Sequence, residues 1–274
     1  MPSITYRDLT TLEEFAAVVE LERQIWGPGY DEVVPVPILA VTVKRGGILI
    51  GAFAGDRMAG FVYSLAGIKA GAPTQWSHML GVVDEHRNDG VGYQLKLLQR
   101  DRALGAGLDL VEWTFDPLQA MNAHFNFAKL GIIVDEYEPN VYGESSSPLH
   151  RGNPTDRFVA EWWVRTPRVD QRLAGSRPMA PAVIVERANR STPAGEWREP
   201  IDLDHALESR RISVEIPTDF TAMLSRAPDL ALRWRMVTRQ LFTTYLERQY
   251  RVVVFFLDRP NHTGTYLLVR RQDQ

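Results

Sequence analysis

Short segments with strand-like and helix-like hydrophobic spacing alternate through the first 137 residues of this chain, and their order constrains the fold most strongly. Strands are expected at 4–7, 48–54, 59–66, 75–83, 110–115 and 132–137. Helices are expected at 12–25, 38–44, 90–104 and 121–130. The short turn between the second and third strands predicts a hairpin. This mixture of a hairpin with strand–helix units predicts the α+β class.

Proline separates this region from the rest of the chain. Eight of the 17 prolines lie between Pro139 and Pro200, so this stretch cannot be mostly regular structure, although one strand is expected at 158–164. Beyond it the pattern predicts a strand, a helix at 228–247 and a final hairpin. We therefore expect a domain over 1–168, a Pro-rich linker over 169–210 and a small C-terminal β-α-β-β module over 211–274. Because about 64 residues are marginal alone, the module should dock on the first domain or, in a homodimer, on another subunit.

Composition excludes several classes of protein. The net charge of −3 lacks the surplus of cations that a nucleic-acid binder usually carries. The absence of cysteine excludes disulfides, thiolate zinc sites and a cysteine nucleophile. No apolar run approaches the ~20 residues that span a bilayer, and the start of the chain has no secretory pattern, so we expect a cytoplasmic protein with no membrane partner. The six histidines show no paired spacing, so no metal is expected.

The most informative segment is 80–92, which reads Leu-Gly-Val-Val-Asp-Glu-His-Arg-Asn-Asp-Gly-Val-Gly and joins an expected strand to an expected helix. Gly90 and Gly92 let the backbone approach a ligand closely, and the unpaired amides of the first helical turn favour an anion. Arg87 adds a positive charge. The segment is therefore a candidate cradle for a pyrophosphate, although the same glycines would also suit a plain strand-to-helix turn.

A second segment, 122–132, reads Asn-Ala-His-Phe-Asn-Phe-Ala-Lys-Leu-Gly-Ile and follows after one more strand. In this order the two segments resemble the GNAT superfamily of acyl-CoA-dependent acyltransferases, over about half of the chain. The resemblance implies a mixed, mainly antiparallel sheet flanked by helices, and an acyl-CoA donor, either acetyl-CoA or succinyl-CoA. The residues that it places at the coenzyme are Leu80, Val82, Arg87, Asn88, Asp89, Gly90, Val91, Gly92, Asn122, Phe125 and Phe127.

The implied reaction is direct attack of a neutral amine on a thioester, which a general base assists. Our candidate base is His78, because strand alternation would place it on one face with Leu80 and Val82, and because a pKa near 6.5 suits the task. A buried histidine bonded to the backbone is the competing interpretation.

Many GNAT enzymes protonate the departing thiolate with a tyrosine at the position that Phe127 occupies here. Phenylalanine has no proton to give. Three interpretations follow: the thiolate leaves unassisted, or Tyr137, Tyr142 or water replaces the tyrosine, or the chain does not catalyse. The last one defines the alternative function, a non-catalytic acyl-CoA-binding or regulatory protein on the GNAT fold.

For the acceptor, the family uses its first helix, the following loop and the last strands. The corresponding residues here are Glu22, Trp26, Tyr30, Asp31, Tyr142, His150, Arg151, Asp156 and Arg157. We single out Trp26, Tyr142 and Arg157 as substrate-binding residues, because a guanidinium suits a carboxylate. Strings such as 77–80 are similar to a bacterial GNAT subgroup with an added C-terminal part, which implies a small-molecule amine acceptor, most simply an amino acid.

Overall fold

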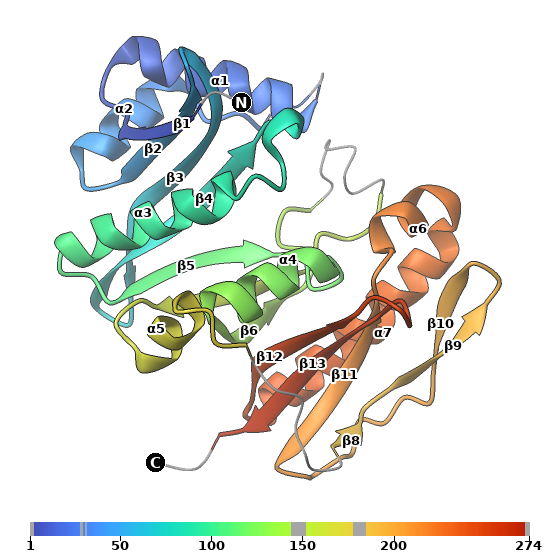
Figure 1. Cartoon of the computed structure of the whole chain (residues 1–274). Coiled ribbons are helices and arrows are strands. Elements are labelled where there is room, and N and C mark those ends of the chain that lie inside the picture. The colour runs from blue at the N-terminus through green and yellow to red at the C-terminus, as the bar shows by residue number, and fades with distance from the viewer. Residues whose placement is uncertain (1–2, 28–29, 31, 144–151, 178–184, 272–274) are drawn as a thin grey trace. The chain divides into compact units, whose positions relative to one another are not determined.

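The computed structural model describes residues 3–27, 30, 32–143, 152–177 and 185–271. These residues group into two compact units. The first, here called the N-terminal unit, holds the described residues up to 113 together with 163–165. The second, the C-terminal unit, holds the remaining described residues from 114 onward. Figure 1 shows the elements of both units along the chain.

The N-terminal unit is built on one sheet, in which the strand order β1-β2-β3-β4-β5 follows the sequence. Its strands are β1 (Ile4–Asp8), β2 (Ile48–Ala54), β3 (Arg57–Lys69), β4 (Ala72–Val82) and the start of β5 (Leu110–Phe115). All neighbours pair antiparallel except β4 and β5, which are parallel. The predicted hairpin is confirmed, because Ala54 pairs with Arg57 across a two-residue turn.

Helices cover both faces of this sheet. They are α1 (Leu12–Trp26), α2 (Val36–Lys44) and α3 (Val91–Gly105). The helix α1 begins at a capping box in which Thr11 and Glu14 satisfy each other's backbone amides. Apolar residues of α1 and α2 share one core with the sheet, including Phe15, Leu39 and Phe61. The buried side chains of α3 lie outside that core, on the other face (Figure 1).

The C-terminal unit has a second run of paired strands in the order β7-β6-β12-β13-β11-β8. Its strands are β6 (Ile133–Glu138), β7 (Arg157–Trp163, whose last residue belongs to the N-terminal unit), β8 (Glu186–Arg187), β11 (Arg211–Pro217), β12 (Tyr250–Asp258) and β13 (Thr263–Arg270). Only β8 and β11 pair parallel. A separate hairpin joins β9 (Arg190–Ala194) to β10 (Trp197–Ile201).

The helical elements of this unit are α4 (Ala120–His124), the π-helical turn η2 (Phe125–Leu130), α5 (Pro167–Leu173), α6 (Phe220–Arg226) and α7 (Pro228–Glu247). The predicted helix at 121–130 is therefore two elements, and it ends as expected at Gly131, which is left-handed. The expectations missed α6. In α7, the predicted stripe buries Trp234, Leu241 and Tyr245 completely.

The predicted fold class is confirmed: the sheet is mixed and mainly antiparallel, with flanking helices in the element order expected from the resemblance. The C-terminal region adds α6 to the expected module, and its strand β12 pairs with β6 through Val252 and Val134. The range predicted as a linker contains the end of α5 and the strands β8, β9 and β10. The domain boundary at residue 168 stays a prediction. None of the described helices is long and apolar enough to cross a membrane.

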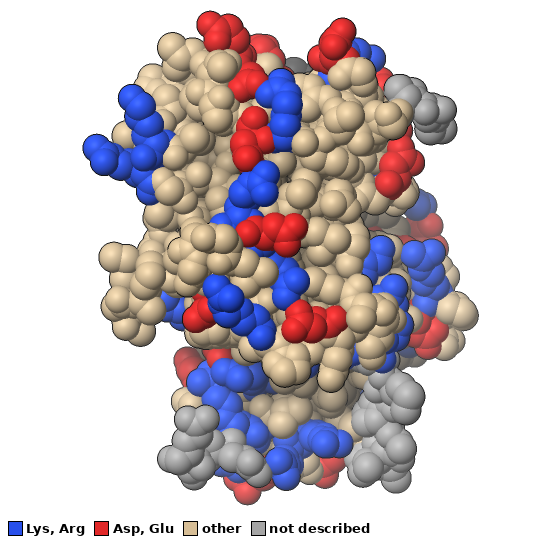
Figure 2. Space-filling model, turned by 60° about the vertical axis from the view of Figure 1, so that its left-hand side comes forward, with Lys and Arg blue, Asp and Glu red and all other residues tan. Residues whose placement is uncertain are grey.

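Opposite charges are interspersed on the surface. On the face drawn in Figure 2, basic and acidic side chains lie next to one another at many points. The N-terminal unit, for example, has exposed ion pairs of Arg102 with Asp8 at 3.0 Å and of Arg165 with Asp109 at 2.5 Å. Such exposed pairs contribute ~0–1 kcal/mol each, so they add little to the stability of the fold.

Candidate functional site

The turn that leads from β4 into α3 has the geometry of an anion cradle. A short 3₁₀ turn, η1 (Asp84–His86), follows the strand, and Asn88 and Gly90 both have positive φ, at 75° and 81°. Gly90 is the N-cap of α3 and offers no side chain to the amides of the first turn. These amides and the helix dipole therefore face outward at an exposed turn, where an anion is favoured.

The space above this turn is open. A Cβ atom on Gly90 would meet no heavy atom within 4 Å, and one on Gly92 would meet only Leu80 and Val82, each at 3.8 Å. The structure thus brings the predicted residues Leu80 and Val82 beside the first turn of α3. Among the other loop residues, Asp89 is exposed, whereas the side chain of Val91 is buried, so that only its amide can serve a ligand.

Arg87 stands at the edge of the turn with about half of its side chain exposed. Its guanidinium forms an ion pair with the exposed Asp84 at 2.8 Å. An exposed pair of this kind exchanges readily with another anion because solvent screens it. The guanidinium can therefore turn from Asp84 to a phosphate at little cost.

A β-bulge sits in β4 at the position of His78. On β3, Tyr63 pairs with Met79 and the next residue, Ser64, pairs with Ser77, so His78 has no partner in the ladder. The bulge interrupts the alternation on which the predicted grouping of His78 with Leu80 and Val82 relied. The prediction that His78 shares a face of the sheet with Leu80 and Val82 is therefore wrong.

The contacts of the side chains before and after the bulge show that it changes which residues of β4 point to each face of the sheet. Ser77 accepts hydrogen bonds from Lys96 and Gln99 of α3, at 3.1 and 3.0 Å. Leu80 also faces α3, beside Gly92. It lies three residues after Ser77, so regular alternation would have placed the two side chains on opposite faces. Met79 belongs to the core shared with α1 and α2.

His78 itself is accessible and packs edge-on against the ring of Tyr63, with ring centroids 6.1 Å apart. Partial desolvation by the surrounding protein lowers the pKa of His78 below its usual 6.5. The imidazole is therefore neutral at pH 7 and able to accept a proton. Accessibility and neutrality are two of the properties that a general base needs. The exposure of His78 argues against the competing interpretation, a buried histidine bonded to the backbone.

Glu22 of α1 is a buried carboxyl group in the same unit. Its side chain has no exposed surface, and its Oε2 accepts the amide hydrogen of Val34 at 2.9 Å. Its Oε1 is buried without a hydrogen-bond partner among the described residues. Burial raises the pKa of Glu22 to about 7. The side chain thus anchors the loop that leads into α2.

We predict that Glu22 makes the N-terminal unit less stable as the pH rises. The unfolded chain loses this proton near pH 4.5, whereas the folded chain keeps it until about pH 7. The unfolding free energy should therefore fall by about 2 kcal/mol across this interval. The variant Glu22→Gln should lose this slope, as measured by urea unfolding at pH 5 and pH 8. A slope equal to that of the native protein would show that Glu22 does not titrate here.

The coenzyme residues predicted in the second segment lie in the C-terminal unit and differ in exposure. Asn122 is exposed in α4 and is not its N-cap, a place that Gln119 takes. Phe125 is half-buried. Phe127 is completely buried, with its ring against Phe115 and Tyr266 at 6.2 and 5.9 Å. The predicted contact of Phe127 with the coenzyme is therefore corrected to a core role, whereas Asn122 and Phe125 stay predictions.

Two predicted acceptor residues come together in the C-terminal unit. The guanidinium of Arg157 lies 5.4 Å from the ring centroid of Tyr142, within range of a cation–π contact. The hydroxyl of Tyr142 is 2.7 Å from that of Thr114 on β5. Tyr142 is 47% exposed and Arg157 is half-buried, so a ligand can reach this pair.

Of the two tyrosines considered as acids, Tyr137 is unsuited. Its hydroxyl donates to Asp156 at 2.5 Å, and burial together with that carboxylate raises its pKa. A phenol whose proton is held in this way cannot protonate a thiolate near pH 7. Tyr142 is the accessible one.

Other predicted residues are less informative. Trp26 ends α1 and stacks on Tyr30, with centroids 5.5 Å apart. Asp31, His150 and Arg151 lie outside the described residues. No group of acidic or histidine side chains in the described part of the chain is arranged to hold a metal ion.

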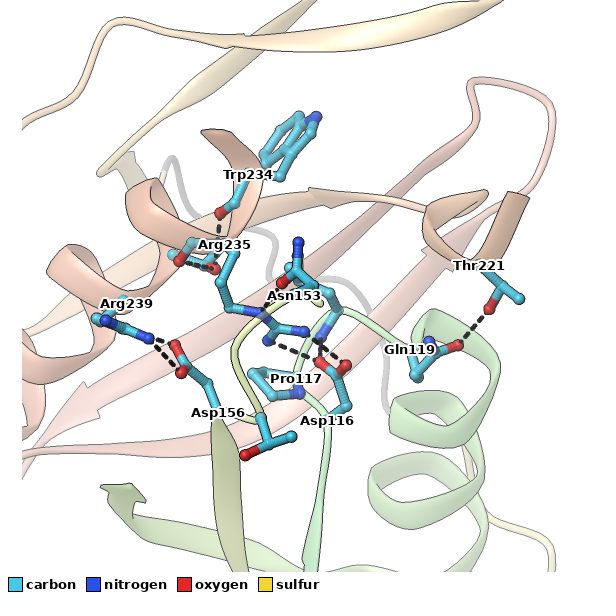
Figure 3. A network of polar contacts seen from close by, with 12 residues as sticks. Asp116, Pro117, Gln119, Asn153, Asp156, Thr221, Trp234, Arg235 and Arg239 are labelled. Atoms are coloured by element: carbon cyan, nitrogen blue, oxygen red, sulfur yellow. Dashed lines mark hydrogen bonds and ion pairs between the residues drawn. The ribbon is translucent and has the colours of Figure 1, made fainter. Parts of the chain in front are cut away.

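The sequence interpretation missed the buried ion pair of Asp116 and Arg235, and no local pattern could have revealed it. Arg235 lies within the predicted helix at 228–247, and no residue near it in the sequence distinguishes it. The two residues are 119 residues apart in the chain, yet the structure joins them by two hydrogen bonds, of 2.9 and 2.6 Å (Figure 3).

Comparisons with known proteins concern the fold. No family model and no curated protein matches the chain. Solved structures that resemble it include the ribosomal-protein-S18-alanine N-acetyltransferase of Escherichia coli, at 13% identity over 60% of this chain and 96% of that chain (TM-score 0.48). A GNAT-family acetyltransferase of Streptococcus pneumoniae matches at 13% identity over 58% and 98% (TM-score 0.46).

A third similar structure is the paia N-acetyltransferase of Thermoplasma acidophilum in complex with coenzyme A, at 18% identity over 58% of this chain and 98% of that chain (TM-score 0.41). Many of the structures found are GNAT acetyltransferases. At these identities the similarity is one of fold. What the site does must be argued from the residues of this chain.

Proposed function

We propose that this protein is an acyl-CoA-dependent N-acyltransferase that moves an acetyl or succinyl group to the amine of a small acceptor, most simply an amino acid. The observation that carries the proposal is the open, left-handed turn at Gly90, where the N-terminal amides of α3 face outward. The pyrophosphate of the donor suits these amides and the exchangeable guanidinium of Arg87. Leu80 and Val82 supply apolar contact beside them.

The chemical demand on the protein is modest. An α-amino group with a pKa near 8 is about one-tenth neutral at pH 7, which costs ~1.4 kcal/mol. His78 is neutral and accessible, so it takes the proton that the amine releases on attack, directly or through one water. The bond from the acyl carbon to the amine nitrogen forms as the bond to sulfur breaks, and the thiolate leaves with the electron pair.

The acid that protonates this thiolate is not Phe127, whose ring is in the core. Tyr142 is the phenol available to a ligand in the C-terminal unit. Because a thiolate is a tolerable leaving group, water serves as well. We therefore propose that catalysis tolerates the loss of this acid.

Tyr142 and Arg157 are proposed to bind the acceptor. The guanidinium of Arg157 lies against the ring of Tyr142, and a guanidinium presents its N–H groups in one plane, which suits a carboxylate. Trp26, Asn122 and Phe125 keep the roles predicted from the sequence.

A second function has one observation in its favour. Phe127 occupies the position of the usual acid, and the burial of its ring leaves no proton donor in that place. This is compatible with a non-catalytic acyl-CoA-binding or regulatory protein. Such a protein would bind the donor at the same turn and release no thiol with any amine.

The variant Gly92→Ala tests the turn. Its new Cβ would make only ordinary contacts at 3.8 Å, and alanine favours the helix by up to ~1 kcal/mol, so the thermal midpoint should hold or rise. The same methyl group projects into the space proposed for the pyrophosphate, so we expect coenzyme A affinity to fall at least ~10-fold, or ~1.4 kcal/mol. Titration calorimetry with coenzyme A measures this effect.

Gly105→Ala at the other end of α3 is the matched control, because it adds the same methyl group to the same helix and its Cβ meets nothing within 4 Å. Equal affinity of both variants for coenzyme A would refute the turn as its site. A free-thiol assay with acetyl-CoA and succinyl-CoA against single L- and D-amino acids then separates the two functions. Coenzyme binding without thiol release would support the regulatory protein.

A further inference from the structure

Lys96 of α3 is buried against the sheet of the N-terminal unit, a place where lysine is rare. Its side chain is 2% exposed. Its Nζ donates to the hydroxyl of Ser77 on β4 at 3.1 Å and to Oε1 of Gln99 at 2.9 Å. The same nitrogen lies 3.6 Å from the ring centroid of Trp113 on β5, within range of a cation–π contact. One side chain of α3 therefore contacts two neighbouring strands.

Gln99 completes this network around Ser77. It is completely buried, three residues after Lys96 on the same helix, and its Nε2 donates to the Ser77 hydroxyl at 3.0 Å. Ser77 is also buried. Buried amine and amide groups that lose their partners cost free energy, because no water replaces the lost hydrogen bonds. The network therefore holds Ser77 firmly on the face of β4 that α3 covers.

A second contact between β4 and α3 follows three residues later. Leu80 lies beside Gly92, where a Cβ atom would be 3.8 Å from it. In a regular strand, residues 77 and 80 would point to opposite faces. Both reach α3 because one extra residue, His78, is inserted between them as a bulge. A one-residue slip of either half of β4 would remove the bulge, but it would carry Ser77 or Leu80 away from α3.

We propose that Lys96 and Gln99 are positioning residues for His78. By holding Ser77 on the α3 face they fix the bulge, and the bulge places the imidazole beside the ring of Tyr63. The helix that carries the proposed coenzyme turn thereby also sets the position of the base. The catalytic value of this position rests on the proposed function. The position itself is measurable without turnover.

An apolar replacement of the network separates positioning from a purely structural role. The triple variant Ser77→Ala/Lys96→Met/Gln99→Leu removes the three hydrogen-bonded side chains together, so none of them is left without the others. Such a replacement is often neutral or favourable for stability. It also removes the polar preference of residue 77 for the α3 face, which helps to fix the register. We therefore expect the urea midpoint to hold or rise while His78 loses its fixed position.

Nuclear magnetic resonance of the imidazole of His78 measures this position, with His78→Ala to identify its signals. In the native protein we expect one set of signals, a contact with the ring of Tyr63, and a pKa below 6.5, because burial lowers it. In the triple variant the contact with Tyr63 should be lost, or a second set of signals should appear. The pKa of His78 should then rise towards 6.5.

Ser64→Ala is the matched control. Ser64 pairs with Ser77 across the ladder and is completely buried. Its hydroxyl donates to Gln75 of β4 at 2.8 Å. The variant thus removes a buried serine hydroxyl beside the bulge and keeps the bonds from Ser77 to α3, so the signals of His78 should stay native.

Native signals of His78 in a folded triple variant would overturn the inference, and so would an equal change in Ser64→Ala. If the triple variant does not fold, Ser77→Ala decides by the same signals, because Lys96 and Gln99 still bond each other. In an active enzyme the displaced base should lower turnover by ~10–100-fold at unchanged affinity for coenzyme A. If the native protein releases no thiol with any amine, the proposed enzyme fails, while the signals of His78 still decide this inference.

Discussion

Replacing His78 by alanine is expected to lower turnover by about two to four orders of magnitude and to leave the affinity for coenzyme A unchanged. His78 is accessible on the bulge of β4, and its lowered pKa keeps it neutral at pH 7. The variant removes a proton acceptor and leaves the turn at Gly90 intact. Steady-state thiol release and calorimetry with coenzyme A measure the two quantities.

The pH profile gives a second readout that a structural role would not change. Protonation of His78 removes the base, so the rate should fall as the pH drops through its pKa, which lies below 6.5. His78→Ala should lack this acidic limb. The exposed His262, which is bound to Asp219, offers the matched control His262→Ala, with full turnover expected. A loss below ~5-fold, or one that follows unfolding, would assign His78 a packing role against Tyr63.

Replacing Arg235 by methionine is expected to lower the unfolding free energy by about 3–5 kcal/mol. The substitution leaves the carboxylate of Asp116 buried without its counter-charge, and that penalty exceeds the value of the ion pair itself. Urea unfolding followed by circular dichroism measures the effect. With a total stability of ~5–15 kcal/mol, the variant should still fold at low temperature.

Arg233→Met is the matched control on the same helix. Arg233 pairs with Glu199 at 2.7 Å, nearly the distance of the buried pair, but both side chains are about half exposed. Its loss should cost less than ~1 kcal/mol. Similar costs for Arg233→Met and Arg235→Met would mean that Asp116 finds solvent or another cation when Arg235 is removed.

The sequence sufficed where structure depends on near neighbours. The start of the first helix after Thr11, the hairpin after β2 and the stop at Gly131 each follow from residues a few positions apart, and the structure has all three. The turn at Gly90 belongs to the same class, because a left-handed glycine before a helix is a local property. The candidate coenzyme loop was therefore visible before the fold.

Elements that depend on distant partners were missed or misjudged. The bulge at His78 exists only in the ladder with β3, and it altered which residues share a face. Phe127 was given to the coenzyme, yet rings from β5 and β13 enclose it. The short strands β9 and β10 lie in the proline-rich range and form because they pair with each other. The proline content of that range predicted a linker instead.

By itself the sequence determined the succession of strands and helices and the candidate anion-binding turn, since periodicity, caps and glycine conformations act over a few residues. Tertiary structure alone decided which charges are buried and how they are paired, as in the raised pKa of Glu22 and the pairing of Asp116 with Arg235. The reason is that desolvation and Coulomb energy depend on neighbours in space, and these can come from distant segments, as Asp116 and Arg235 do.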